Sequence, residues 1–337
     1  MNKKRISFFI SIIVSLLLIW LLYRQIEFRD LVYTFTRIYI PALFIFFIIH
    51  LIGSWLRSWR YKILLLPHKI SWGDIFLTTF IRNLFVDLLP ARVGSLSYIY
   101  VLNKRLNYTF ESAASSFTFA FVLDFLTLGP FLILALFMAG PVIKIQAGSS
   151  LAVFSIIFFI VVLLIYMKIV LIFKFILAAL QYFFKVFHLS EKKWTITVLE
   201  KLKLTIDSVI LTQKRGVFGK VLILSFLIRL AKYSAAFFLL FALLKSHGFG
   251  IPQINFFIMI LGITGAELTS ILPIKGLGGF GTWESAWALT LTQLGFESRI
   301  AILSSGIHLI SNLFEYILGF ASILILSSPY YKKINKN

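Results

Sequence analysis

The chain contains no cysteine among its 337 residues. That absence excludes a disulfide framework, a thiolate metal site and a cysteine nucleophile. Charged residues make up only 14% of the chain, and 13 Asp and Glu residues stand against 33 Lys and Arg residues. The motifs Asp-x-Asp, His-Glu-x-x-His and Gly-x-Ser-x-Gly, and a phosphate loop ending in Gly-Lys-Ser/Thr, are also absent. We therefore expect no catalytic residue, no metal and no cofactor.

Apolar sequence, in contrast, is abundant: 60% of the residues are hydrophobic and the mean hydropathy is +0.95. Runs over residues 6–23, 40–56 and 150–167 approach the roughly 20 residues that a membrane-spanning helix needs. The net charge of +20 comes from Lys and Arg residues that lie mostly between such runs. This is typical of a membrane protein with basic cytoplasmic loops, so a nucleic-acid partner is not expected.

The apolar runs predict an all-α, polytopic membrane protein with about six spanning helices. The expected spans lie near residues 6–23, 39–56, 112–139, 150–167, 219–244 and 300–325. The first of them is followed by bulky and charged residues instead of a signal-peptide cleavage site, so we interpret it as an uncleaved span. Two further apolar segments, 73–102 and 254–293, are interrupted by Pro and Gly.

The positions of the basic residues decide between two topologies. Both ends of the chain are basic, which predicts a cytoplasmic-membrane protein with both termini in the cytoplasm. If segments 73–102 and 254–293 are re-entrant hairpins, the basic segment 168–216 also falls on the cytoplasmic side. Eight complete crossings would place that segment outside, so hairpins are favoured. Its helical spacing predicts amphipathic helices on the inner leaflet, although it could instead bind a partner protein.

The two interrupted segments share a sequence pattern. Residues Leu89–Gly94 and Leu272–Gly276 both read Leu-Pro-x-basic and then reach a glycine. We infer two membrane repeats, 1–140 and 141–337, each with one hairpin. Because each repeat has an odd number of crossings, the second is expected to be inverted relative to the first, as in secondary transporters.

The hairpin loops are candidates for an anion site. Pro and Gly at membrane depth free backbone N–H and C=O groups, which must then face protein or water. Helix N-termini after the loops would attract an anion. The expected headgroup-binding residues are Arg92, Lys275, Arg82, Arg229, Gly94, Gly278, Gly279 and Gly281. Alternatively, the breaks only let helices pack closely, and the basic side chains extend to the headgroup layer.

Further charged residues lie within the expected spans, where a charge at the helix centre costs about 2.5–3.5 kcal/mol. Candidates for charge balance or proton coupling are Asp87, Asp124, Glu267, Glu284, Glu315 and His308. On the last span, His308 and Glu315 share one polar face with Asn312. The sequence leaves open whether these groups act in function or only neutralise one another.

The pattern at Leu89–Gly94 and the glycine-rich run Leu272–Glu284 resemble the lysylphosphatidylglycerol synthase transmembrane-region family, over nearly the whole chain. The resemblance implies translocation of a lipid with a polar headgroup across the cytoplasmic membrane, without nucleotide hydrolysis by this chain. Ser95 departs from the acidic residue that members often carry there, whereas Glu284 keeps the acidic residue of the second loop. No aminoacyl-transferase domain follows the last span, so synthesis of aminoacylated lipid is not expected.

The favoured hypothesis is a lipid flippase or transporter that holds a headgroup phosphate between the hairpins. Its partners would be an anionic phospholipid, an aminoacyl lipid or a polyprenyl-phosphate lipid, and a homo-oligomer or a lipid-synthesis enzyme is open as a further partner. Two alternatives remain. One is a glycosyl or headgroup transferase that uses a polyprenyl-phosphate donor, and the other is a scaffold that docks a partner through segment 168–216.

Overall fold

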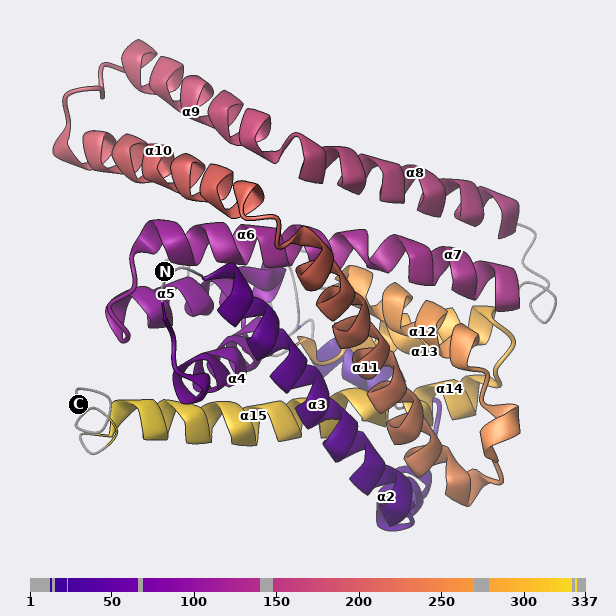
Figure 1. Cartoon of the computed structure of the whole chain (residues 1–337). Coiled ribbons are helices and arrows are strands. Elements are labelled where there is room, and N and C mark those ends of the chain that lie inside the picture. The colour runs from indigo at the N-terminus through magenta and orange to yellow at the C-terminus, as the bar shows by residue number, and fades with distance from the viewer. Residues whose placement is uncertain are drawn as a thin grey trace.

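The chain folds into helices, and no strand occurs among the residues that the computed structural model describes (Figure 1). These are residues 13, 16–22, 24–65, 69–139, 148–269, 279–328 and 331. The prediction of an all-α polytopic membrane protein is confirmed. The predicted first span, 6–23, and the termini lie mostly outside the described residues.

Five helical stretches are long and apolar enough to cross a membrane: Ile40–Leu64, Phe110–Ala139, Ile169–Val186, Phe218–His247 and Ser298–Ser327. Four of them coincide with the predicted spans 39–56, 112–139, 219–244 and 300–325. The predicted span 150–167 corresponds to α8 (Gly148–Met167). Its apolar part with described side chains, Val153–Met167, is shorter than the five.

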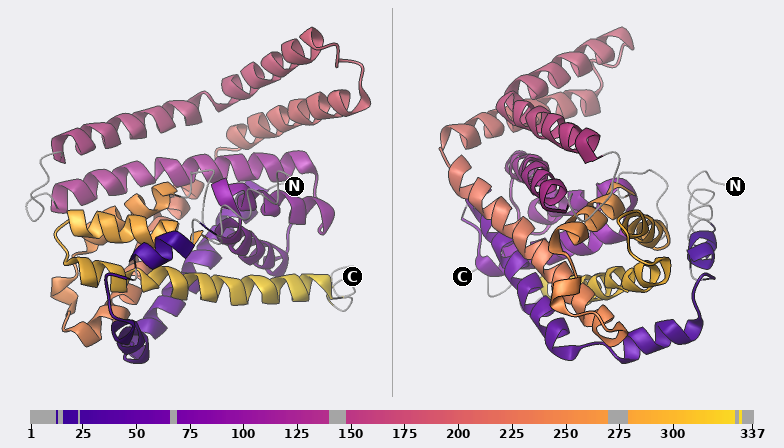
Figure 2. Two further views of the ribbon diagram at one scale, coloured as in Figure 1. Left: turned by 180° about the vertical axis from the view of Figure 1, so that it is seen from behind. Right: turned by 90° about the vertical axis from the view of Figure 1, so that its right-hand side faces the viewer.

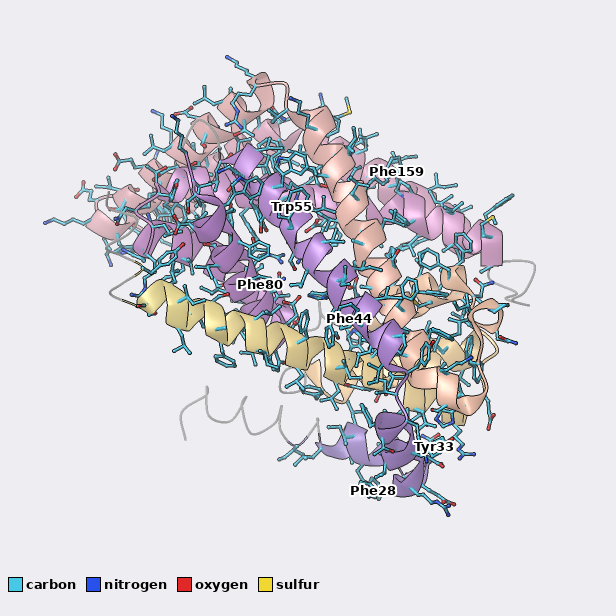
Figure 3. The ribbon with its side chains drawn as sticks, turned by 60° about the horizontal axis from the view of Figure 1, so that its bottom comes forward. Phe28, Tyr33, Phe44, Trp55, Phe80 and Phe159 are labelled. Carbon is cyan, nitrogen blue, oxygen red and sulfur yellow. The ribbon has the colours of Figure 1, made fainter. Side chains whose placement is uncertain are left out.

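The long helices follow the predicted spans closely. They are α3 (Ile40–Leu64), α6 (Phe110–Leu126) with its continuation α7 (Leu128–Ala139), α11 (Phe218–Leu244), and α15 (Gly306–Ser327) with the short preceding helix α14 (Ser298–Ser304). Helix α3 packs along α11, and α15 packs along α4 (Trp72–Leu88). Large apolar side chains such as Phe44 and Trp55 remain exposed on α3, as expected for a surface in contact with lipid tails (Figure 3).

Segment 168–216 forms an arm of two helices. Helix α9 (Ile169–Val186) continues nearly in line with α8, and α10 (Lys193–Lys214) returns alongside it (Figures 1 and 2). By length and composition α9 is as well suited to a spanning position as to the predicted surface position. Only α10 keeps the mixed, charged composition that the sequence suggested for the whole segment.

The predicted hairpin 73–102 is formed by α4, the 3₁₀ helix η1 (Pro90–Leu96) and α5 (Ser97–Lys104). Ser71 begins α4 by accepting a hydrogen bond from the N–H of Asp74 at 3.0 Å. Leu89 has an extended backbone before Pro90, which ends α4 and starts η1. Gly94 packs η1 directly on α4, because a Cβ there would overlap the backbone of Phe85 and Val86. The break is thus a close-packed turn.

The predicted hairpin 254–293 contains α12 (Phe256–Leu268) and α13 (Thr282–Gln293), which lie side by side. Asn255 caps α12 by accepting from two backbone N–H groups. Gly281 precedes α13 with a φ of 85°, a left-handed conformation that glycine adopts without strain. The two hairpins lie at opposite ends of the long helices α6–α7 and α15 (Figures 1 and 2). This arrangement suits an inverted repeat, which stays a prediction together with the number of spans.

Candidate functional site

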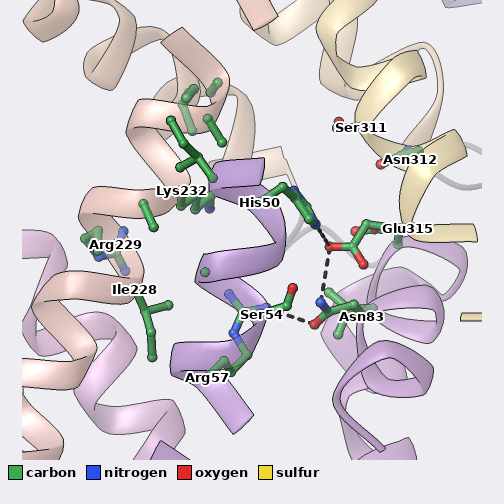
Figure 4. Close-up of a pocket in the computed structure, with 18 of the residues that line it drawn as sticks. His50, Ser54, Arg57, Asn83, Ile228, Arg229, Lys232, Ser311, Asn312 and Glu315 are labelled. Atoms are coloured by element: carbon green, nitrogen blue, oxygen red, sulfur yellow. Dashed lines mark hydrogen bonds and ion pairs between the residues drawn. The ribbon is translucent and has the colours of Figure 1, made fainter. Parts of the chain in front are cut away.

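A cavity of about 310 Å³ lies where α3, α4, α11 and α15 meet (Figure 4). Helices α6, α12 and α13 contribute one or two residues each. Within the described part of the chain, the charged residues of its wall are Arg57, Arg82, Arg229, Lys232, Asp87, Asp124, Glu267 and Glu315, together with His50 and His308. Seven residues that the sequence singled out therefore meet here: Arg82, Arg229, Asp87, Asp124, Glu267, Glu315 and His308.

Two arginines of the wall converge on one neutral oxygen. The Nη1 atom of Arg57 on α3 donates to Asn83 Oδ1 at 2.8 Å, and Arg82 Nη1 donates to the same oxygen at 3.2 Å. Among the described residues neither guanidinium has a carboxylate partner. The Nε atoms of both are buried without a hydrogen-bond partner there. The two positive charges, held beside one amide oxygen, attract an anion strongly.

The amide of Asn83 also contacts a carboxylate. Its Nδ2 donates to Glu315 Oε1 at 3.1 Å, and His50 Nε2 lies 2.8 Å from the same oxygen (Figure 4). The Asn83 amide is oriented with Oδ1 toward the two arginines and Nδ2 toward Glu315. The contacts on both sides agree with this orientation, because a carboxylate oxygen accepts a hydrogen bond and Asn Nδ2 donates one. Helices α3, α4 and α15 are therefore joined by one polar chain.

Asp124 has a partner that the sequence analysis missed. Its Oδ1 accepts from Arg60 Nη1 at 2.6 Å, and Arg60, which is fully buried, also donates to Ser225 Oγ at 2.8 Å. Arg229 donates to the backbone oxygen of Asp124 and to Thr127 Oγ1, so neutral groups hold it at the wall. The negative charge of Asp124 is thus balanced by Arg60.

Two other acidic candidates are also paired. Glu267 on α12 forms an ion pair with Lys232 on α11. Glu284 Oε1 lies 2.6 Å from Nδ1 of His308, whose ring stacks on Trp283 at 4.6 Å between centroids. Glu284 itself is behind His308 and does not line the cavity. Pairing, one of the two roles left open by the sequence, therefore holds for these carboxylates.

The glycine-rich loop is placed only in part. The N–H of Gly281, which the sequence predicted to face an anion, donates instead to Glu284 Oε2 at 2.7 Å. The first acidic residue of α13 thus satisfies this N–H, and a contact of Gly281 with a headgroup stays a prediction. Gly279 is buried and has a φ of 82°. Lys275 and Gly278, and the side chain of Arg92, lie outside what the structure describes.

The sequence contained a signal for the residues that were missed. His50, Ser54 and Arg57 are spaced i, i+4 and i+7 on an otherwise apolar helix, the same pattern that drew attention to the last span. Asn83 is a single polar residue beside Arg82 and carries no pattern of its own. Its role arises only from the contacts between helices.

The fold and the cavity define a multi-pass membrane protein with a charged site between its helices. The family described as the lysylphosphatidylglycerol synthase TM region matches residues 8–319, and the chain belongs to this family. This confirms the resemblance noted from the sequence and indicates a membrane protein related to lipids. No curated protein matches the chain.

Proposed function

We propose that this protein is a flippase or transporter that moves a lipid with an anionic, phosphate-containing headgroup across the cytoplasmic membrane. The headgroup would enter the cavity between α3, α4, α11 and α15, while the acyl tails stay in the bilayer. The observation that carries the proposal is the convergence of Arg57 and Arg82 on the neutral Asn83 Oδ1. A phosphate supplies the negative charge and the several acceptor oxygens that two guanidinium groups can bind.

The charges around the cavity support this assignment of roles. Asp124, Glu267 and Glu315 each contact a basic or histidine side chain, namely Arg60, Lys232 and His50. The guanidinium groups of Arg57 and Arg82 have no such contact among the described residues. The paired carboxylates would thus keep the wall folded, and the two arginines would bind the substrate. A cavity of about 310 Å³ is of the size of small-ligand pockets.

The hairpin residues keep a place in the proposal. Arg92, Lys275 and the glycines at 94, 278 and 279 would guide the headgroup toward the cavity from the two hairpin loops. Arg229 would add a third positive charge at the wall, since its hydrogen bonds go to neutral groups. We place both termini in the cytoplasm on the strength of their basic residues.

Transport is tested in reconstituted vesicles of phosphatidylcholine that contain a trace of lipid with a labelled headgroup. Labelled phosphatidylglycerol, an aminoacyl lipid and a polyprenyl phosphate are compared, and movement between leaflets is followed by the loss of protection from an external quencher. Movement above empty vesicles for at least one anionic lipid supports the proposal, and none for all three overturns it. New covalent lipid species detected by mass spectrometry would favour the transferase instead.

The orientation is tested with single cysteines, because the chain has none of its own. A cysteine placed within residues 103–108 should react with an impermeant thiol reagent only from the cytoplasmic side. One placed within 294–298 should react only from outside. The reverse accessibility at either position would overturn the inverted arrangement of the two hairpins.

A further inference from the structure

The carboxyl group of Glu315 has an unusual environment. Glu315 is 8% exposed, and both of its hydrogen-bonding neighbours, His50 and Asn83, contact the same oxygen, Oε1. The other oxygen, Oε2, is buried and has no hydrogen-bond partner among the described residues. A proton can therefore add to Oε2 without breaking either existing contact.

Glu315 is one amide group away from the two arginines. Asn83, which is 4% exposed, donates to Glu315 through Nδ2 and accepts from Arg57 and Arg82 through Oδ1. A change of charge on Glu315 is thus felt across a short, rigid and poorly solvated bridge, where electrostatic interactions are strong. While Glu315 is ionised, its negative charge partly offsets the positive charge of the guanidinium groups.

We propose that the His50–Glu315 pair binds a proton together with the anionic headgroup, with Asn83 linking the proton site to the Arg57–Arg82 site. The inference rests on the proposed function and adds a coupling ion to it. When Glu315 Oε2 takes a proton from water, the pair loses its net negative charge, and the two arginines attract an anion more strongly. By thermodynamic reciprocity, a bound anion then raises the proton affinity of the pair by the same factor.

Other titratable groups surround the pair on every side. They are Arg57 on α3; Arg82 and Asp87 on α4; Asp124 on α6; Arg229 and Lys232 on α11; Glu267 on α12; Glu284 on α13; and Tyr316 and His308 on α15. The ring of His308 stacks on Trp283. Asp124, Glu267 and Glu284 contact a basic or histidine partner directly. Among the carboxylates, Glu315 combines a buried, unpartnered oxygen with a bridge to the two arginines. His308 is the group whose titration most needs to be separated from that of the pair.

The consequence for transport is a changed net charge on the moving complex. A phosphodiester headgroup that travels with one proton on Glu315 presents two positive guanidinium groups against one negative charge instead of two. Burial of charge in the low-dielectric part of a membrane is costly, so the number of balanced charges affects the rate of the conformational change. Proton binding would thereby link headgroup movement to pH.

The test is calorimetric titration of the purified full chain in detergent with a short-chain phosphatidylglycerol. A phosphodiester does not titrate between about pH 5 and 8, unlike a phosphomonoester, whose second pKa is about 6. Binding heats are measured at pH 7 in two buffers with different ionisation enthalpies, which yields the number of protons taken up per lipid. We expect net proton uptake and an affinity that rises by up to about tenfold per unit decrease in pH.

Glu315→Gln is the decisive variant, because glutamine has the shape of the protonated carboxyl group. It should bind the lipid with the affinity that the natural protein has at low pH, independently of pH and without proton uptake. The matched control is Glu200→Gln, an exposed carboxylate on α10 outside the cavity, which should behave as the natural protein. His308→Gln should retain the proton uptake.

The outcomes separate the two claims. Lipid binding without proton uptake in the natural protein overturns the coupling and leaves the proposed function standing. The coupling is also overturned if Glu315→Gln takes up as many protons as the natural protein, or if proton uptake is lost in His308→Gln alone. Failure of the lipid to bind at any pH overturns the proposed function and the coupling together. If Glu315→Gln does not elute as a folded protein, His50→Gln, which alters the other member of the pair, takes its place. The coupling is then judged from that variant and from the number of protons that the natural protein takes up per lipid.

Discussion

Arg60 and Asp124 form a buried ion pair that joins α3 to α6, with 2.6 Å between Arg60 Nη1 and Asp124 Oδ1. Arg60 is fully buried, whereas Asp124 keeps 27% of its side chain exposed toward the cavity. The Nε and Nη2 atoms of Arg60 have no hydrogen-bond partner among the described residues. The positive charge of Arg60 is therefore compensated mainly through Asp124, which makes this pair a sensitive point of the fold.

Replacement of Asp124 by Asn should destabilise the protein strongly. Loss of one partner leaves a buried charge unpaired, which typically costs about 3–5 kcal/mol. The measurement is thermal unfolding in detergent, followed by intrinsic fluorescence. As a control, the double variant Arg60→Met with Asp124→Leu removes both charges and should recover most of the lost stability. A double variant as unstable as Asp124→Asn would contradict the charge explanation.

Replacement of Arg57 or Arg82 by Gln should slow the movement of the anionic lipid. Each change removes a charge-assisted contact worth about 1.5–3 kcal/mol, so the rate or apparent affinity should fall by about 10- to 100-fold. The rate and the apparent affinity are measured as transport of the labelled lipid in reconstituted vesicles. Arg29→Gln, which alters an exposed arginine on α2 (Phe28–Thr36), is the matched control and should transport normally. Equal rates for all three variants would remove the two arginines from the site.

Replacement of Gly94 by Ala should displace the first hairpin. The new methyl group would overlap the backbone of Phe85 and Val86, and overpacking of this kind usually costs about 1–3 kcal/mol. Thermal unfolding and transport should both decline. The matched control is Gly219→Ala near the start of α11, where an added Cβ meets nothing within 4 Å. A fully stable and active Gly94→Ala protein would show that η1 can move away from α4 at no cost.

The contact between Asp30 on α2 and Arg299 on α14 should contribute a pH-dependent part of the stability. The hydrogen bond from Arg299 lowers the pKa of Asp30 below its usual value. A lowered carboxyl pKa means that the contribution is complete above about pH 4 and is lost as the pH falls through the folded-state value. Asp30→Asn should therefore be slightly less stable at pH 7.

The measurement for this pair is thermal unfolding of the natural protein and of Asp30→Asn between about pH 3 and 7. The difference between them should shrink as the pH falls below about 4. Asp207→Asn, an exposed carboxylate on α10, serves as the control and should show no such trend. Because Asp30 and Arg299 are in contact with solvent, added salt should weaken the effect. A difference that stays constant across this range would mean that Asp30 does not titrate with folding.

The positions of helices and breaks could be predicted because their causes are local. An apolar run of sufficient length forms a helix in the membrane whatever surrounds it, and Pro90 ends α4 through the geometry of its own ring. Segments 73–102 and 254–293 each contain two helices for the same reason, and their re-entrant course stays a prediction. Helix α9 shows the limit, since Ile169–Val186 is apolar enough to span and was assigned to the membrane surface from a few spaced polar residues.

The sequence alone determined that this is an all-helical membrane protein with charged residues that lipid cannot accommodate. Only the tertiary structure decided which of those charges are neutralised and which are available. His50 and Glu315, or Arg60 and Asp124, are far apart in the chain. They meet because α3 packs against α4 and α6, and because Phe46 and Phe47 of α3 pack against Phe314 of α15. Packing is a property of whole helix surfaces, and the shared contact of Arg57 and Arg82 with Asn83 follows from it.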